Sequence, residues 1–87
     1  MKTPDFQKNL TAARAFQAAA VDPSFWEGYI RGLRRHYHGA QFGTAEEHAE
    51  WMALADGQGD EQRIAKGRGY RAGVIGTPVS ELAESKV

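Results

Sequence analysis

The chain has 87 residues, of which 41% are hydrophobic and 25% charged, and its 11 basic and 11 acidic side chains cancel to a formal net charge of zero. This composition is typical of one small globular domain and excludes a disordered or membrane-spanning class. Without cysteine, neither a disulfide framework nor a thiolate metal site is available. The N-terminal "MKTPDFQKNL" has no apolar stretch that could serve as a signal peptide, so we expect a cytoplasmic protein.

Proline marks three helix starts along the chain. In each case a residue that caps helices well precedes a proline, whose missing N–H group costs nothing at the first helical position. The dipeptides are Thr3-Pro4, Asp22-Pro23 and Thr77-Pro78.

Two further helix starts depend on side-chain caps. In "TAEE" the hydroxyl of Thr44 can accept a hydrogen bond from the N–H group of Glu47, three residues on. The side chain of Glu47 can in turn reach back to the backbone of Thr44. Asp60 can cap the next helix, which Gly76 ends in a left-handed conformation. No segment has the alternation of a strand. We therefore predict an all-α bundle in a single domain, residues 1–87, with helices at about 4–20, 23–37, 44–55, 60–75 and 78–84.

Apolar side chains recur at helical spacing and predict the core. In the first helix they are Phe6, Leu10, Ala13, Phe16 and Ala20. In the second helix one face holds Phe25, Trp26, Tyr29, Ile30, Leu33 and Tyr37. The opposite face holds Arg31, Arg34 and Arg35, which we expect to point outward. The aromatic content is high for so small a core, so we expect partial exposure of Trp26, Tyr37 and Phe42.

The third predicted helix combines an apolar flank with an acidic face. Ala45, Ala49, Trp51 and Met52 form the flank, and Glu46, Glu47 and Glu50 form the face. His48 lies in the apolar arc, where we interpret it as a structural residue with one or two hydrogen bonds. Residues 46–61 contain acidic but no basic side chains, whereas residues 63–71 contain the reverse. Such blocks are typical of solvated helix faces that attract each other within a fold or across a dimer.

A repeated G-Y-x-x-G motif predicts close helix contact. It occurs as "GYIRG" at 28–32 and as "GYRAG" at 69–73, inside two predicted helices. Glycines four residues apart share one side of a helix and expose its backbone, so that another helix can approach closely. Whether the two helices cross each other or meet copies of themselves in a dimer is left open by the spacing.

The stretches "GRGYRAGVIG" at 67–76 and "FWEGYIRG" at 25–32 resemble helices of the ribosome modulation factor family. The resemblance implies a helical hairpin that binds ribosomal RNA, with Arg68 and Arg71 contacting phosphates. It covers about eighteen residues of the chain.

Catalytic and metal-binding motifs are not found in the sequence. There is no thiol nucleophile, G-x-S-x-G motif, P-loop or dinucleotide fingerprint. Two residues apart on a helix, His36 and His38 point about 160° away from each other, so a metal site would require the helix to end at His36 and His48 to join from the third helix. We predict a protein with no catalytic residues, no cofactor and no bound metal.

Protein binding is the function that these observations favour. By analogy with other compact helical proteins, we predict a non-enzymatic interaction module, such as an accessory or inhibitory protein of a phage or mobile element, for example a host-defence inhibitor. A second copy of the chain is one candidate partner. The predicted partner-binding residues are Arg31, Arg34, Arg35, Tyr37, Phe42, Glu46 and Glu50. The alternative is RNA or ribosome binding through Arg31, Arg34, Arg35, Arg68 and Arg71.

Overall fold

The computed structural model describes residues 2–84, and within that range every regular element is a helix. The predicted all-α bundle is confirmed, with boundaries within two residues of the expected ones. The radius of gyration is 12.2 Å, close to the roughly 12 Å expected for a folded chain of this length. The α-helices are α1 (Thr3–Ala19), α2 (Ser24–His38), α3 (Ala45–Ala53), α4 (Glu61–Val74) and α5 (Val79–Glu84), with 3-10 turns η1 (Gly39–Gln41) and η2 (Leu54–Asp56) on either side of α3.

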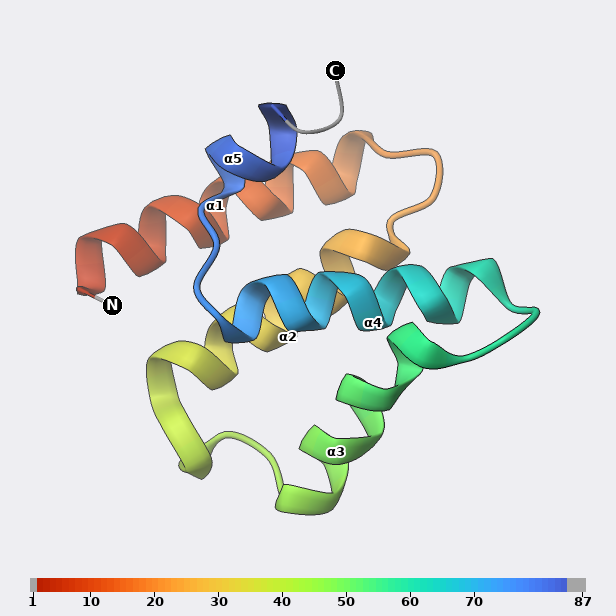
Figure 1. Cartoon of the computed structure of the whole chain (residues 1–87). Coiled ribbons are helices and arrows are strands. Elements are labelled where there is room, and N and C mark those ends of the chain that lie inside the picture. The colour runs from red at the N-terminus through yellow and green to blue at the C-terminus, as the bar shows by residue number, and fades with distance from the viewer. Residues whose placement is uncertain (1, 85–87) are drawn as a thin grey trace.

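The pair α2 and α4 forms the centre of the molecule. In Figure 1 these helices lie against each other, with α1 and α5 on one side and α3 on the other. No helix among residues 2–84 has the length and apolar character needed to cross a bilayer.

Glycine allows α2 and α4 to touch backbone to backbone. A β-carbon at Gly28 would overlap the carbonyl group of Lys66, and one at Gly69 would overlap that of Phe25. Gly32 and Gly73 meet the opposite helix in the same way. The question that the G-Y-x-x-G spacing left open is thereby answered, because the two motifs face each other within one chain and are covered there.

The core lies between α2 and the helices around it. Tyr29 and Leu33 are fully enclosed, and Trp26 is 3% exposed, so the expected partial exposure of Trp26 is wrong. Phe16 was expected in the core but is 42% exposed, with its ring stacked 4.9 Å from that of Trp26. The buried hydrophobic residues are Phe6, Ala13, Trp26, Tyr29, Leu33, Tyr70 and Val79.

Local capping signals are confirmed for α3 and α4. The hydroxyl of Thr44 accepts a hydrogen bond from the N–H of Glu47 at 3.1 Å, which is the first half of the predicted capping box. The carboxylate of Glu47 accepts from the Thr44 hydroxyl at 3.4 Å and from Arg31 at 2.6 Å, in place of the predicted bond to the backbone of Thr44. Asp60 Oδ1 accepts from the N–H groups of Gln62 and Arg63 at 3.0 and 3.2 Å. At its other end α4 stops before Gly76, which has the predicted left-handed backbone, φ = 78°.

The proline-linked caps of α1 and α5 differ from expectation. The predicted cap Thr3 is the first residue of α1, and its hydroxyl bonds to the hydroxyl of Tyr37 instead of capping the helix. At α5 the N–H of Val79 donates to the side-chain oxygen of Asn9 at 2.9 Å. A tertiary contact from α1 therefore satisfies this helix start, in place of Thr77.

The start of α2 also departs slightly from the predicted cap. Asp22 lies one residue before the cap position and accepts from both the N–H and the hydroxyl of Ser24, at 3.0 and 2.6 Å. These bonds lower the pKa of Asp22. The aspartate therefore still orders the entrance of the helix, through a local turn.

The segment around α3 is attached without any fully buried side chain. Residues 39–60 are all exposed or half-buried. Ala45 and Ala49 were assigned to the apolar flank of this helix, but both are exposed, whereas Trp51 and Met52 are half-buried. The apolar flank of α3 is consequently narrower than its sequence pattern indicates.

Candidate functional site

A groove of about 360 Å³ runs over α2 between α1 and α3 and brings three arginines together. Guanidinium groups come from α1 and α2, and apolar side chains come from α2, from the end of η1 and from α3. We call it the arginine groove. It is lined by Arg14, Gln17, Glu27, Ile30, Arg31, Arg34, Phe42 and Trp51.

Arg31 is the fixed cation of the arginine groove. Its Cζ lies 4.9 Å from the ring centroid of Trp51 and 5.5 Å from that of Phe42, so its guanidinium contacts two aromatic rings. Its Nη2 donates to Glu47 Oε2 at 2.6 Å. The prediction that Arg31 points outward is therefore only partly correct, because the side chain is half-buried and already paired.

Arg14 and Arg34 are the free cations of the groove. Among residues 2–84 neither of them has a hydrogen-bond or ion-pair partner, and Arg14 is exposed while Arg34 is half-buried. The carboxylate that borders the same groove, Glu27, lies 3.4 Å from the ammonium group of Lys66. The groove therefore presents two uncompensated guanidinium groups beside one that is held in place.

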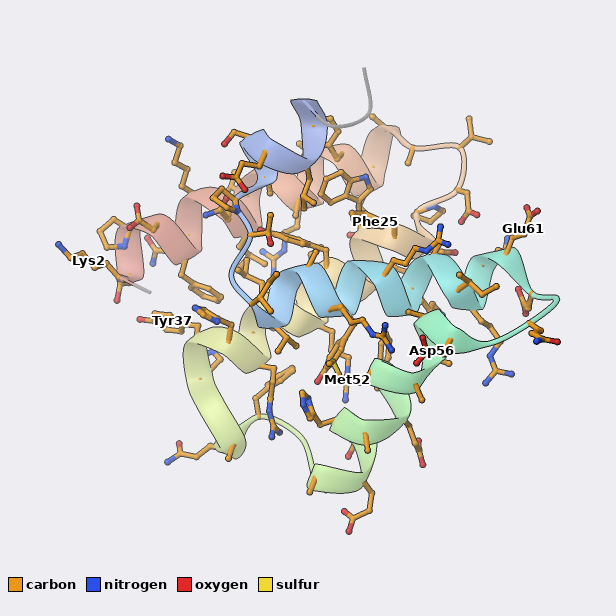
Figure 2. All side chains as sticks on the ribbon, in the orientation of Figure 1. Lys2, Phe25, Tyr37, Met52, Asp56 and Glu61 are labelled. Carbon is orange, nitrogen blue, oxygen red and sulfur yellow. The ribbon has the colours of Figure 1, made fainter. Side chains whose placement is uncertain are left out.

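Arg35 and Arg71 hold neighbouring backbone and are not free to bind a ligand in this state. Arg35 Nη1 donates to the carbonyl oxygen of Phe42 at 2.9 Å. Arg71 Nε donates to the carbonyl of Met52 at 2.8 Å and its Nη2 to Asp56 Oδ2 at 2.7 Å. Figure 2 shows Met52 of α3 and Asp56 of η2 beside α4. The guanidinium forks thus satisfy carbonyl groups near helix ends.

The two histidines with tertiary hydrogen bonds are structural in this arrangement. His48 Nδ1 lies 2.7 Å from the hydroxyl of Tyr70, in agreement with the interpretation of His48. Burial raises the pKa of Tyr70 and so favours its neutral hydroxyl. His36 Nδ1 lies 2.7 Å from the carbonyl oxygen of Val74. In the described part of the chain no three His, Cys, Asp or Glu side chains are grouped so that they could hold a metal ion.

The other predicted site residues lie apart from the arginine groove. The Tyr37 ring stacks on Phe6 with centroids 4.1 Å apart. Glu46 is exposed on α3, and Arg68 is exposed on α4.

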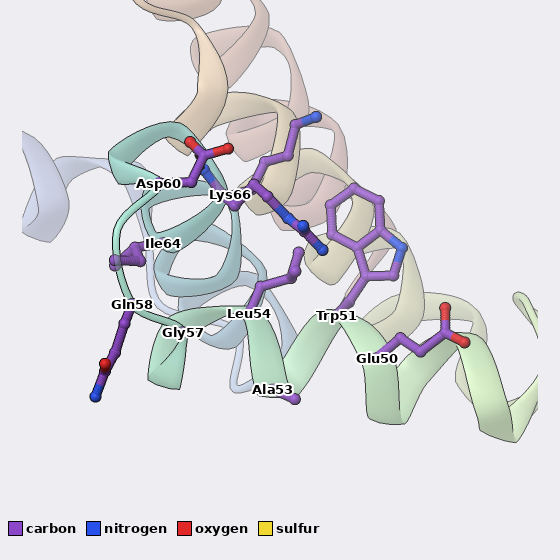
Figure 3. Close-up of a pocket in the computed structure, with 10 residues that line it drawn as sticks. Glu50, Trp51, Ala53, Leu54, Gly57, Gln58, Asp60, Ile64 and Lys66 are labelled. Atoms are coloured by element: carbon purple, nitrogen blue, oxygen red, sulfur yellow. Dashed lines mark hydrogen bonds between the residues drawn. The ribbon is translucent and has the colours of Figure 1, made fainter.

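Glu50 borders a second groove, of about 640 Å³, between α3 and the N-terminal half of α4. In Figure 3 the side chains of Trp51 and Leu54 project toward α4, whereas Gln58 points away. Acidic and basic side chains both border this groove, so it presents no single sign of charge.

Five groove residues were not among the predicted site residues, namely Arg14, Gln17, Glu27, Ile30 and Trp51. Arg14 lies one turn beyond Leu10 and next to Ala13, so its place at the border of the apolar face of α1 is a signal that the sequence carries. Trp51 was assigned to the apolar flank of α3. That Trp51 also lines a groove with α1 depends on how the helices pack.

Comparison of the chain with models of known families, with curated proteins and with solved structures gave no match. The chemistry of the groove is therefore judged from its own side chains. Guanidinium groups bind carboxylates or phosphates through paired N–H donors, and Ile30, Phe42 and Trp51 offer apolar contact beside them. This combination is suited to recognising an anion that carries an apolar group.

Proposed function

We propose that the protein is a non-enzymatic interaction module and that its arginine groove binds an acidic segment of a partner protein. The observation that carries the proposal is the presence of two unpaired guanidinium groups, those of Arg14 and Arg34, beside the fixed Arg31. Carboxylates on the partner would pair with these groups, and a bulky apolar side chain next to them would rest on Ile30 and Phe42.

Charge supports a protein partner over a nucleic acid. Affinity for nucleic acids comes mainly from neutralising phosphates and usually requires an excess of basic side chains. This chain has none overall, and Arg31, Arg35 and Arg71 are engaged internally. A role as an accessory or inhibitory protein of a phage or mobile element remains a prediction by analogy.

Binding of a fluorescein-labelled peptide of glutamates around one phenylalanine tests the proposal by fluorescence anisotropy. We expect Arg14→Gln with Arg34→Gln to weaken binding about tenfold, since two ion pairs are lost and each one at an exposed or half-buried guanidinium contributes about 0.2–1 kcal/mol. The matched control is Arg63→Gln with Arg68→Gln, which removes the same charge from the exposed face of α4. Equal loss in both double variants, or no binding by the wild-type protein at low salt, would contradict the proposal.

RNA or ribosome binding is the second candidate. The guanidinium groups of Arg14, Arg34 and Arg68, which have no ion-pair partner within residues 2–84, favour it. Replacing the peptide with a labelled single-stranded oligouridylate tests it in the same assay. An RNA-binding protein should show a steep fall in affinity with rising salt concentration. The Arg63/Arg68 double variant should then lose affinity for RNA as well as the Arg14/Arg34 double variant. A shallow dependence of affinity on salt, together with an unchanged affinity of the Arg63/Arg68 double variant for RNA, would exclude this candidate.

A further inference from the structure

We infer that residues 39–60, which we call the acidic arm, act as an internal competitor of the arginine groove and that a bound acidic ligand displaces the α3 part of the arm. The inference rests on the proposed function and adds a regulatory contact to it. It follows from how the acidic arm is attached, which charges it carries and where these charges lie.

Polar contacts attach the acidic arm to both α2 and α4. Arg35 holds the carbonyl of Phe42, Arg31 pairs with Glu47, and His48 bonds to Tyr70. Further along the arm, Arg71 holds the carbonyl of Met52 and the carboxylate of Asp56. Apolar contact comes from half-buried side chains such as Trp51, whose ring centroid lies 5.5 Å from that of Tyr70. No side chain of the acidic arm is fully buried, so its α3 part lacks the type of contact that makes an element costly to detach. The backbone of Leu54 and Ala55 in η2, by contrast, rests directly on Gly67 of α4, so we expect η2 to stay in place.

The charges of the acidic arm resemble those of the ligand that we propose. The arm contains no lysine or arginine. Two of its carboxylates form ion pairs with arginines of the central helices. Glu47 pairs with Arg31 of α2, and Asp56 pairs with Arg71 of α4. Its carboxylates are those of Glu46, Glu47, Glu50, Asp56 and Asp60.

The two ion pairs of the arm are accessible to a competitor. The side chains of Arg31 and Glu47 are 32% and 46% exposed, and those of Arg71 and Asp56 are 40% and 75% exposed. Solvent screens such pairs, so they stabilise the closed arm only weakly. A ligand carboxylate that reaches Arg31 replaces Glu47 with a contact of the same kind, and the free Arg14 and Arg34 supply additional binding energy.

Displacement is expected to move the N-terminal part of α3, which carries Glu47, and to leave η1 and the C-terminal end of α3 in place. The bonds from Arg35 to the carbonyl of Phe42 and from Arg71 to the carbonyl of Met52 involve no carboxylate, so an acidic ligand does not compete for them directly. Loss of the Glu47 contact frees the guanidinium of Arg31 for the ligand and removes a constraint on Trp51. Ligand affinity and arm position are then thermodynamically coupled, so that weakening the closed arm strengthens binding.

Paired variants of equal charge test the inference. Glu47→Gln with Asp56→Asn removes the two carboxylates that pair with arginine, whereas Glu46→Gln with Glu50→Gln removes two exposed carboxylates of the same arm that have no ion-pair partner within residues 2–84. We expect the first variant to bind the labelled acidic peptide about fivefold more tightly than wild type and the second to change binding less than about twofold. Equal changes in both would overturn the inference.

Fluorine NMR on protein labelled with 5-fluorotryptophan reports arm position without any ligand. Trp51 lies on the acidic arm and Trp26 in the core, so they serve as reporter and internal control, and Trp51→Phe assigns the signals. In the absence of peptide, the Glu47/Asp56 variant should shift the Trp51 signal and leave that of Trp26 unchanged, while the Glu46/Glu50 variant should shift neither.

The two measurements separate the inference from the proposed function. An unchanged Trp51 signal in the Glu47/Asp56 variant, with peptide binding intact, overturns only the competitor role of the arm. A shifted Trp51 signal without binding of the acidic peptide to any variant instead overturns the proposed function. The single variant Glu47→Gln provides the same readout if the double variant unfolds.

Discussion

Gly69 of α4 rests directly on the carbonyl group of Phe25 in α2, and a β-carbon at this position would overlap that oxygen and lie 2.8 Å from the backbone nitrogen of Tyr29. In the reverse direction, Gly32 of α2 rests on the backbone of Tyr70. Each helix therefore uses a glycine to accommodate the backbone of the other. The enclosed position of Tyr29 depends on this short distance between the helices.

Gly69→Ala should destabilise the protein by about 3 kcal/mol, because the overlapping atom belongs to backbone and the two helices would have to separate. Urea unfolding followed by circular dichroism measures the change in the free energy of unfolding. Ala15→Gly on the exposed face of α1 serves as the reference variant, because it should lower the free energy of unfolding by only about 1 kcal/mol through helix propensity. A more stable Gly69→Ala protein, as propensity alone would produce, would contradict the close crossing.

Gly76→Ala and Gly43→Ala should differ although both glycines have φ = 78°. The left-handed backbone should cost each variant about 1–2 kcal/mol. At Gly76 a β-carbon would also lie 2.9 Å from Nε2 of His36, whose ring is held by its bond to Val74, whereas at Gly43 the nearest atoms lie 3.8 and 3.9 Å away. We therefore expect Gly76→Ala to have the lower melting temperature, and equal melting temperatures would mean that the His36 ring yields freely.

Stability should fall at alkaline pH as Tyr29 ionises. Burial raises the pKa of Tyr29 from 10.0 to about 12, and its hydroxyl donates to the carbonyl of Thr77 at 2.7 Å. Because the folded pKa exceeds the unfolded one, the contribution of Tyr29 is complete below pH 10 and is lost as the pH rises from 10 toward 12. Urea unfolding at a series of pH values should show a weaker dependence in this range for Tyr29→Phe than for wild type. The same slope in both proteins would assign the alkaline loss to other groups.

Arg31 and Arg34 should respond differently to the same substitution, although both lie on α2. Arg31→Gln removes an ion pair and two ring contacts, so we expect a loss of about 1 kcal/mol in unfolding free energy. Arg34→Gln removes no partner within residues 2–84 and should stay within about 0.5 kcal/mol of wild type. Thermal unfolding of both variants measures the difference. A larger loss for Arg34 would show that its stem, and not its charge, is structurally important.

Much of the candidate site lay beyond sequence reasoning because its residues come from separate helices. Arg31, Arg34 and Phe42 were predicted as binding residues and do line the groove. Arg14 belongs to α1, and no local pattern indicates that α1 lies beside α2 at that point. Likewise a helical projection places Arg35 and Arg71 on outward faces of their helices. In the structure both donate hydrogen bonds to carbonyl groups of neighbouring segments, those of Phe42 and Met52.

The sequence by itself determined where the helices form, because capping, proline and apolar spacing act within one or two turns of backbone. The caps at Thr44 and Asp60 and the stop at Gly76 are of this kind. It also determined that two glycine faces needed a close neighbour. Only the tertiary structure decided that these faces meet each other, that Asn9 caps α5 and which arginines remain unpaired. Those outcomes depend on distances between helices far apart in the chain, and these distances are set by the packing of the whole core.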